Sequence, residues 1–211
     1  MSWDDLSADP EALFRVRPPD ALISEAFQRS AALGLGTPSL EIGRMLEILA
    51  GEPSVARVLE IGRGVGFSTL CLARGAAQAE VLSVDPRDDF RTEAAALVER
   101  AGLEDRVGLT TADPLSAIEA VEGYFDLIHL SVAIADTLRL VDRVLPKLAV
   151  GGVLTVEGLR PTDESAIDRA RAVAGYLVMH PQLDTLVLAL GEGLGVARKK
   201  KPLVTEMGGP Y

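Results

Sequence analysis

Short, almost wholly apolar runs alternate with longer alanine-rich stretches along the middle of the chain, and this alternation constrains the fold most. The runs predict strands at 57–61, 80–84, 107–111, 125–130 and 152–156. The stretches between them predict helices at 67–74, 89–101, 114–121 and 134–148. Strands that are apolar along their whole length are typical of parallel sheets covered by helices on both faces. We therefore expect repeated β-α units around a parallel sheet.

The end of the chain predicts a different strand direction. Runs at 183–190 and 194–198 are separated only by Gly191-Glu192-Gly193, which is typical of a hairpin turn. Because no crossover helix fits in so short a connection, these two strands should be antiparallel. The expected fold is an α/β, Rossmann-like three-layer sandwich with a seven-stranded, mostly parallel sheet and an antiparallel last strand.

Three further helices complete the expected domain, at 20–33, 39–50 and 163–179. We expect one domain over residues 1–198, whose helices within 20–50 pack on the sheet or on a partner, and a flexible tail at 199–211. Asp89 is the predicted cap of the helix at 89–101, and Gly102 is its predicted end.

Composition narrows the class of protein. The chain has 21 Lys and Arg against 31 Asp and Glu, a formal net charge of −10, whereas binding to nucleic-acid phosphates requires basic surface. No apolar run reaches the roughly 18–20 residues that span a bilayer, and the first residues lack a signal-peptide pattern. The one cysteine, Cys71, cannot form an internal disulfide and is expected in the core. We expect a cytoplasmic protein without nucleic-acid or membrane partners.

A glycine-rich loop, Gly62-Arg63-Gly64-Val65-Gly66, connects the first predicted strand to a helix. Glycines there permit positive φ angles and close approach of a ligand, and the helix start offers free N–H groups to an anion. The dinucleotide fingerprint needs a glycine where Phe67 stands, which disfavours NAD. Asp85 ends the second strand about 20 residues after the loop, where a carboxylate can bind ribose hydroxyls. Its alternative role is to cap a turn.

Other polar residues stand at predicted strand ends. Glu60 directly precedes the glycine loop, and its carboxylate can hold the loop backbone, meet a ligand ammonium group, or do both. His129, Asp136 and Glu157 are candidate catalytic bases near the ends of the fourth and fifth strands. The alternative for His129 is a buried neutral side chain, and the alternative for Glu157 is a strand-end residue that pairs with Arg160 or solvent.

The pattern Glu60-x-Gly62-x-Gly64-x-Gly66, Asp85 and the terminal hairpin resemble the class I S-adenosylmethionine-dependent methyltransferases. More narrowly, residues 20–200 are similar to bacterial O-methyltransferases related to catechol and caffeoyl-CoA methyltransferases. The similarity is carried by Val58 to Leu72, Ala101 to Val107, Phe125 to Ile128, Leu145 to Leu148 with Gly151-Gly152, and Leu190 to Leu194. This resemblance implies S-adenosyl-L-methionine as methyl donor, a small-molecule acceptor and a homodimer.

The resemblance also implies a methyl-donor site. Glu60 would bind the methionine ammonium, Ser68 the methionine carboxylate and Asp85 the ribose. Arg63 stands where the family has a small residue, and it either pairs with the donor carboxylate or is solvated. The full set of expected donor-binding residues is Gly36, Glu60, Gly62, Arg63, Gly64, Gly66, Ser68, Asp85, Asp113 and Ser131.

The chain departs from the family at the metal site. Catechol-type members hold a divalent cation with an Asp after the fourth strand and an Asp-Asn pair after the fifth, where this chain has Ser131, Glu157 and Gly158. One carboxylate is a poor site for Mg²⁺, so we expect no catalytic metal. Two hypotheses remain: a metal-free methyltransferase that acts on a small-molecule hydroxyl, and a non-catalytic donor-binding or regulatory protein on the same fold. A nicotinamide oxidoreductase is a third alternative.

Overall fold

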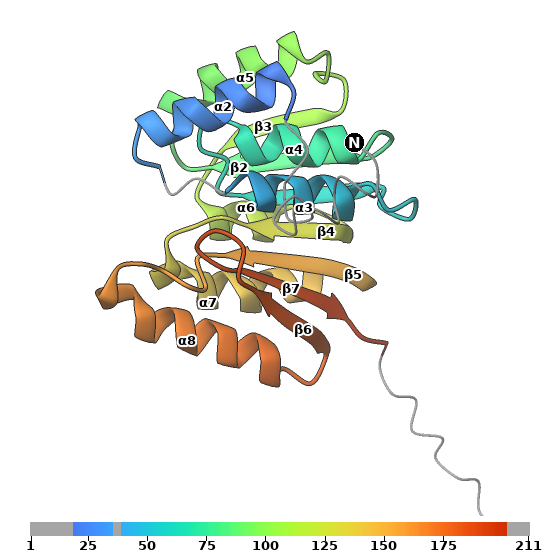
Figure 1. Ribbon diagram of the computed structural model, residues 1–211. Helices are drawn as coiled ribbons and strands as arrows, with labels where there is room; N and C mark the ends of the chain where they lie inside the picture. The colour runs from blue at the N-terminus through green and yellow to red at the C-terminus, as the bar shows by residue number, and fades with distance from the viewer. Residues whose placement is uncertain (1–18, 36–38, 202–211) are drawn as a thin grey trace, which may run out of the picture.

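The computed structural model describes residues 19–35 and 39–201, which form a seven-stranded sheet between two layers of helices (Figure 1). The strands are β1 (Arg57–Ile61), β2 (Glu80–Asp85), β3 (Val107–Thr111), β4 (Phe125–Leu130), β5 (Leu148–Glu157), β6 (Leu183–Leu188) and β7 (Leu194–Lys199). The helices are α2 (Ala21–Ala32), α3 (Leu40–Ala50), α4 (Phe67–Gly75), α5 (Asp89–Arg100), α6 (Pro114–Ala120), α7 (Ile134–Val144) and α8 (Glu164–Met179), and η2 (Leu145–Lys147) is a 3-10 turn.

The strand order is β3-β2-β1-β4-β5-β7-β6. Neighbours among the first five strands are parallel, and β7 is antiparallel to both β5 and β6. The predicted mostly parallel sheet with an antiparallel last strand is confirmed. Chain order reverses between β1 and β4, and open α/β sheets bind ligands beyond the carboxyl ends of the strands at such a reversal.

Each face of the sheet carries its own apolar core. On one face, α2, α3, α4 and α5 cover a cluster that includes Ile42, Phe67 and Leu97. On the other face, α6, α7 and α8 cover a cluster that includes Ile118 and Leu177. Both layers are visible in Figure 1. None of the described helices is long and apolar enough to cross a membrane.

Helix ends follow ordinary capping chemistry, with one correction. The side chains of Asp20 and Ser39 accept from the backbone of the first turns of α2 and α3, which is how such residues stabilise helix starts. Asp89 is not the cap of α5: Asp88 occupies that position without a side-chain cap bond, and Asp89 is the first helical residue. Gly102 follows the end of α5 with φ +64°, as predicted for a helix stop.

The region around Pro146 was predicted wrongly. The helix predicted to reach residue 148 ends at Val144, and β5 begins at Leu148 rather than at Gly152. Proline has no N–H with which to continue a helix, and Leu148 pairs with Phe125 before the register of β4 and β5 shifts. A bulge therefore joins two parts of a strand of which the sequence showed only the second.

The last strand runs one residue further than expected. Lys199 belongs to β7, and its ammonium group donates to the carbonyls of Leu145 and Leu148, each at 2.7 Å. The predicted tail therefore cannot begin at residue 199. Residues 202–211 lie outside the described part of the chain.

Candidate functional site

A cleft of about 910 Å³ lies where strand order reverses, beyond the carboxyl ends of the strands. The predicted donor-binding residues that line it are Gly62, Arg63, Gly64, Ser68, Asp85, Asp113 and Ser131. Two candidate bases, Asp136 and Glu157, line it as well. Glu60, Gly66 and His129 do not line the cleft, and Gly36 lies outside the described residues.

The glycine loop passes very close to the end of β4. Gly62 has φ +96°, and a Cβ atom on it would lie 1.9 Å from the carbonyl oxygen of Ser131. Gly66 has φ +101° and begins α4 without a side-chain cap. Only glycine adopts such a conformation freely, so the first glycine allows the loop to approach β4, and the last allows a close approach to Ala94, 3.2 Å from where a Gly66 Cβ would lie.

Asp85 is held rigidly at the cleft. Its side chain is 6% exposed. One carboxylate oxygen accepts from the Gly64 N–H at 2.9 Å and the other from the Arg87 N–H at 2.8 Å. Since a carboxylate has about four acceptor positions, each oxygen can still accept another hydrogen bond from a ligand.

Glu60 belongs to a buried hydroxyl network, which we call the glycine-loop cluster: Glu60, Ser68, Thr69 and Ser83. The hydroxyl groups of Ser68, Thr69 and Ser83 donate to the Glu60 carboxylate at 2.5, 2.5 and 2.6 Å. Glu60 itself is fully buried. The structure therefore shows this carboxylate fastening the start of α4 to β1 and β2, while its contact with a ligand ammonium group stays a prediction.

Arg63 is buried rather than solvated, so that alternative was wrong. The side chain is 2% exposed, and Nη1 donates to the carbonyls of Ser83 (3.1 Å) and Thr110 (3.3 Å). Its Nε and Nη2 atoms find no hydrogen-bond partner among the described residues. Burial lowers the pKa of Arg63, and the nearby carboxylates of Glu60 and Asp85 act in the opposite direction.

A second polar network, which we call the His–Glu cluster, consists of His129, Ser131, Thr155 and Glu157. His129 is fully buried, with Nδ1 2.9 Å from Thr155 Oγ1 and Nε2 3.0 Å from Glu157 Oε1. The second contact has ion-pair distance but not the angle of a hydrogen bond among the described atoms. Ser131 Oγ donates to Glu157 Oε2 at 3.2 Å.

Glu157 is 8% exposed and lines the cleft. Its Oε1 atom lies 3.0 Å from His129 Nε2, and the alternative pairing with Arg160 is not found among the described residues. The alternative role of His129 was a buried neutral side chain, and the structure confirms that it is buried. The carboxylate thus connects a buried imidazole to the cleft.

The remaining candidates have simpler surroundings. Asp136 is exposed in the first turn of α7. Asp113 caps α6, and hydrogen bonds from the backbone and hydroxyl of Ser116 lower its pKa. Cys71 is 1% exposed, and burial raises the pKa of its thiol well above the usual value. The prediction that Cys71 is a core residue is confirmed.

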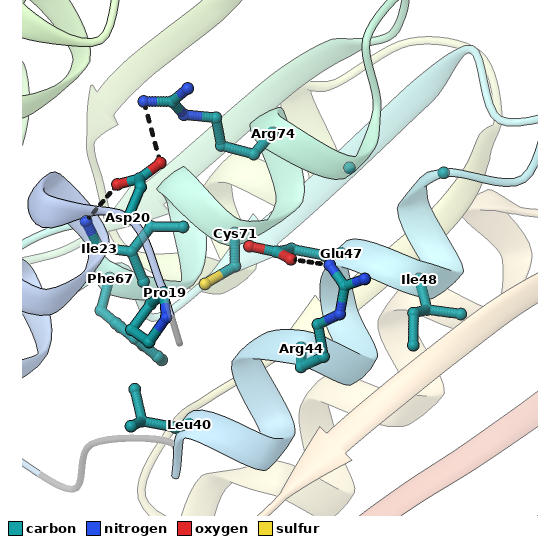
Figure 2. A pocket seen from close by; sticks show the side chains of 12 residues that line it. Pro19, Asp20, Ile23, Leu40, Arg44, Glu47, Ile48, Phe67, Cys71 and Arg74 are labelled. Carbon is teal, nitrogen blue, oxygen red and sulfur yellow. Dashed lines mark hydrogen bonds and ion pairs between the residues drawn. The ribbon is translucent and has the colours of Figure 1, made fainter. Parts of the chain in front are cut away.

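A second cavity, of about 410 Å³, lies between α2, α3 and α4 (Figure 2). Figure 2 shows Arg44 and Glu47 paired on one wall and Asp20 with Arg74 on another. Because these charged groups are already paired with each other, this cavity offers less unsatisfied polar chemistry than the cleft.

The residues at the family's metal positions do not fit a catechol-type metal ion. Of Ser131, Glu157 and Gly158, only Glu157 has a carboxylate, and one of its oxygens faces His129. Within residues 19–35 and 39–201, no group of three or more His, Cys, Asp or Glu side chains is placed to hold a metal. The absence of a metal ion from catalysis stays a prediction.

Sequence reasoning missed Thr69, Ser83 and Thr155. Ser83 and Thr155 lie two residues before Asp85 and Glu157, and residues two apart in a strand share a face. The strand register aligns Ser83, Glu60, His129 and Thr155 across β2, β1, β4 and β5. The spacing was therefore present in the sequence, but the alignment required the strand order.

Comparisons with known proteins agree with this geometry. Residues 59–157 match a family described as a methyltransferase domain. A catechol O-methyltransferase of Mycobacterium tuberculosis is 29% identical over 159 residues, which cover 71% of this chain and 72% of that relative.

Solved structures share the fold. A protein of Corynebacterium glutamicum has a TM-score of 0.80 and 24% identity, with 94% of this chain and 97% of that chain covered. An O-methyltransferase from Bacillus cereus in complex with SAH has a TM-score of 0.77 and 22% identity, with 92% and 97% covered. These similarities confirm the resemblance to the class I S-adenosylmethionine-dependent methyltransferases, in the group related to catechol and caffeoyl-CoA O-methyltransferases.

Proposed function

We propose that this protein transfers the methyl group of S-adenosylmethionine to a hydroxyl group of a small-molecule acceptor, without a catechol-type metal ion. The observation that carries the proposal is the meeting of the glycine loop and Asp85 at one cleft. Gly64 donates to the same carboxylate that faces the cleft. The relative named as a catechol O-methyltransferase supports a hydroxyl acceptor.

The cleft residues fit such a donor. Asp85 is fixed by two backbone N–H groups and keeps acceptor capacity for the two hydroxyls of a ribose. Carboxylates along the cleft, among them Asp85, Asp136 and Glu157, favour a ligand that carries positive charge. The volume of about 910 Å³ is at the upper end of small-molecule sites, which leaves space for an acceptor beside the donor.

The donor and the chain have different parts in the proposed methyl transfer. S-adenosylmethionine supplies an activated methyl group on a positively charged sulfur. The chain holds donor and acceptor in line and limits water between them, and such positioning alone can lower a barrier by several kcal/mol. Phe67, Phe90 and Leu140 add apolar surface to the cleft, which suits an acceptor with an apolar body.

Titration calorimetry with S-adenosylmethionine tests the donor site. We expect measurable binding to the wild type and binding at least about 10-fold weaker to Asp85→Ala, because a hydrogen bond to a charged group contributes roughly 1.5–3 kcal/mol. Asp105→Ala, which removes an exposed carboxylate in the turn before β3, is the matched control and should bind within about 2-fold of wild type. No heat at millimolar donor would contradict the proposal.

Donor binding without catalysis is the alternative, favoured by the missing metal ligands. A product assay with hydroxyl, amine and thiol probes separates the two. Acceptor-dependent formation of the demethylated donor excludes the binding-only alternative, and formation with hydroxyl probes alone supports the proposal. The proposed homodimer rests on the resemblance and is tested by light scattering, which should give twice the mass of the chain.

A further inference from the structure

We propose that Glu157, which contacts His129 and Ser131 and lines the cleft, takes the proton of the acceptor hydroxyl, and that His129 and Thr155 position it. This inference rests on the proposed methyl transfer and adds its general base. Glu157 is the catalytic residue of the proposal because it alone joins the buried imidazole to the cleft.

Position supports this role. Ser131 contacts the glycine loop. Its carbonyl oxygen lies 1.9 Å from the position that a Cβ atom on Gly62 would occupy. The Ser131 hydroxyl donates to Glu157, and both side chains line the cleft. The carboxylate therefore stands one strand away from the loop that defines the donor site.

The cluster has one state before the proton transfer and one after it. In the first state, the Thr155 hydroxyl donates to Nδ1 of His129, across 2.9 Å. The imidazole carries its proton on Nε2, which lies 3.0 Å from Glu157 Oε1 without the angle of a hydrogen bond among the described atoms. The cluster has a net charge of −1 by this proton count.

In the second state, the cluster holds one more proton, which lies on the Glu157 carboxylate at the cleft. The Thr155 hydroxyl keeps its contact with Nδ1 of His129, at 2.9 Å. The imidazole therefore stays in place while the carboxylate gains the proton.

The reaction balances with this proton. The acceptor O–H bond breaks and an O–CH₃ bond forms, while the S–CH₃ bond breaks and its electron pair stays on sulfur. The acceptor proton passes to Glu157. The cluster loses its negative charge as the donor loses its positive charge, so the buried site keeps the same total charge. That avoids the cost of creating a net charge in a medium of low dielectric constant.

Other charged groups at the cleft do not have this arrangement. Asp136 is exposed on α7, and Asp85 and Asp113 are engaged by backbone N–H groups. Glu60, aligned with His129 on the neighbouring strand, already accepts three hydroxyl protons. Among the described carboxylates that line the cleft, only Glu157 contacts an imidazole.

The first experiment compares wild type, Glu157→Gln and the control Glu99→Gln, an exposed position on α5. The probes are catechol, phenol, and a nitro-substituted phenol that is ionised at the assay pH. We expect Glu157→Gln to lower kcat by about 10²–10⁴-fold with catechol or phenol, and much less with the ionised phenol, which has no proton to give. Donor affinity should stay within about 2-fold of wild type in Glu99→Gln, and calorimetry on Glu157→Gln separates a change in donor binding from a change in turnover.

Several outcomes overturn the proposal. Equal losses with neutral and ionised phenols would assign Glu157 a structural role. A large loss in Asp136→Asn with wild-type turnover in Glu157→Gln would make Asp136 the base. Failure of the wild type to bind donor would instead contradict the proposed function, so the two failures are distinguishable.

A second readout needs no acceptor. The chain has two histidines, so ¹⁵N NMR of the imidazole nitrogens, assigned with His180→Gln, reports on His129 directly. We expect wild-type His129 to carry its proton on Nε2, which lies opposite Glu157. A proton on Nδ1 with Nε2 bare would overturn the proposal.

Thr155 provides a test of the positioning role. Thr155→Val keeps the size of the side chain but removes the hydroxyl that serves His129 in both states. We expect a roughly 10-fold lower kcat with unchanged donor affinity, and recovery in Thr155→Ser, which restores the hydroxyl. A wild-type rate in Thr155→Val would contradict the positioning role.

Discussion

The glycine-loop cluster and the His–Glu cluster lie on the same face of the sheet, and each contains one buried carboxylate. Glu60 is fully buried and accepts from three hydroxyl groups of neighbouring elements. Glu157 accepts from one hydroxyl, faces an imidazole and reaches the cleft. The comparison shows how one residue type serves two purposes: three hydroxyl donors occupy the Glu60 carboxylate inside the protein, whereas the Glu157 carboxylate is open to the cleft.

The two clusters also differ in the property that each should support, which is stability for one and turnover for the other. Buried carboxylates are costly unless they are hydrogen-bonded, and the three donors of Glu60 join α4 to β1 and β2. Removal of this carboxylate should therefore change stability first. Removal of Glu157 should change turnover first, because fewer donors depend on it.

The largest effect should come from Gly62→Ala, where the glycine loop contacts Ser131 of the His–Glu cluster. A Cβ atom there meets the Ser131 carbonyl at 1.9 Å with φ +96°, so we expect a loss of at least about 3 kcal/mol in the free energy of unfolding. Gly102→Ala is the matched control, because its φ is +64° and nothing lies within 4 Å of a Cβ atom. Urea unfolding should give about 1 kcal/mol for the control, and equal losses would refute the steric explanation.

Glu60→Ala breaks the glycine-loop cluster alone. Three buried hydroxyl groups lose their acceptor, and we expect unfolding in urea to show a loss of about 2–3 kcal/mol. The exposed Glu99→Ala should change stability by less than about 0.5 kcal/mol. If Glu60→Ala were as stable as the control, the hydroxyl network would not hold the start of α4.

Ser83→Ala removes one of the three donors to Glu60. The expected loss is about 1.5 kcal/mol, the usual contribution of one hydrogen bond to a charged group. Two donors remain, so the double variant Glu60→Ala with Ser83→Ala should be no less stable than Glu60→Ala. Additive losses in this double-mutant cycle would show that Ser83 acts elsewhere.

The smallest effect on stability should come from Thr155→Val in the His–Glu cluster. One neutral hydrogen bond is lost and the volume is kept, so thermal or urea unfolding should report about 1 kcal/mol. Stability and turnover should separate here, with a small loss of the first and a larger loss of the second. A loss greater than that of Ser83→Ala would reverse the contrast between the clusters.

Much of the fold was predictable because it depends on local patterns. Uniformly apolar runs identified the parallel strands, and the short Gly191-Glu192-Gly193 turn identified the antiparallel end. The start of β5 was missed because Leu148 and Val150 follow Pro146 and flank a bulge, where neither helical nor strand periodicity is regular. Long-range pairing with Phe125 decides that segment, and no local signal contains it.

The kind of ligand site could be predicted from the sequence, but the contacts of several of its side chains could not. Asp85 and the glycine loop were expected at one ligand site, and they line one cleft. The burial of Arg63 was not expected, because its acceptors are carbonyls of β2 and β3 that only the strand order brings together. The pairing of His129 with Glu157 likewise depends on the register of β4 and β5, which a sequence does not specify.

The close approach of Gly62 to Ser131 lies where neighbouring strand ends meet beneath the cleft. Ile61 accepts from the Ser131 N–H at 2.9 Å and Gly62 donates to the Val84 carbonyl at 2.8 Å, so the ends of β2, β1 and β4 are joined through the backbone. These strands cannot hinge apart without breaking those bonds. The joined strand ends therefore form a continuous backbone support beneath the cleft in which ligands would exchange.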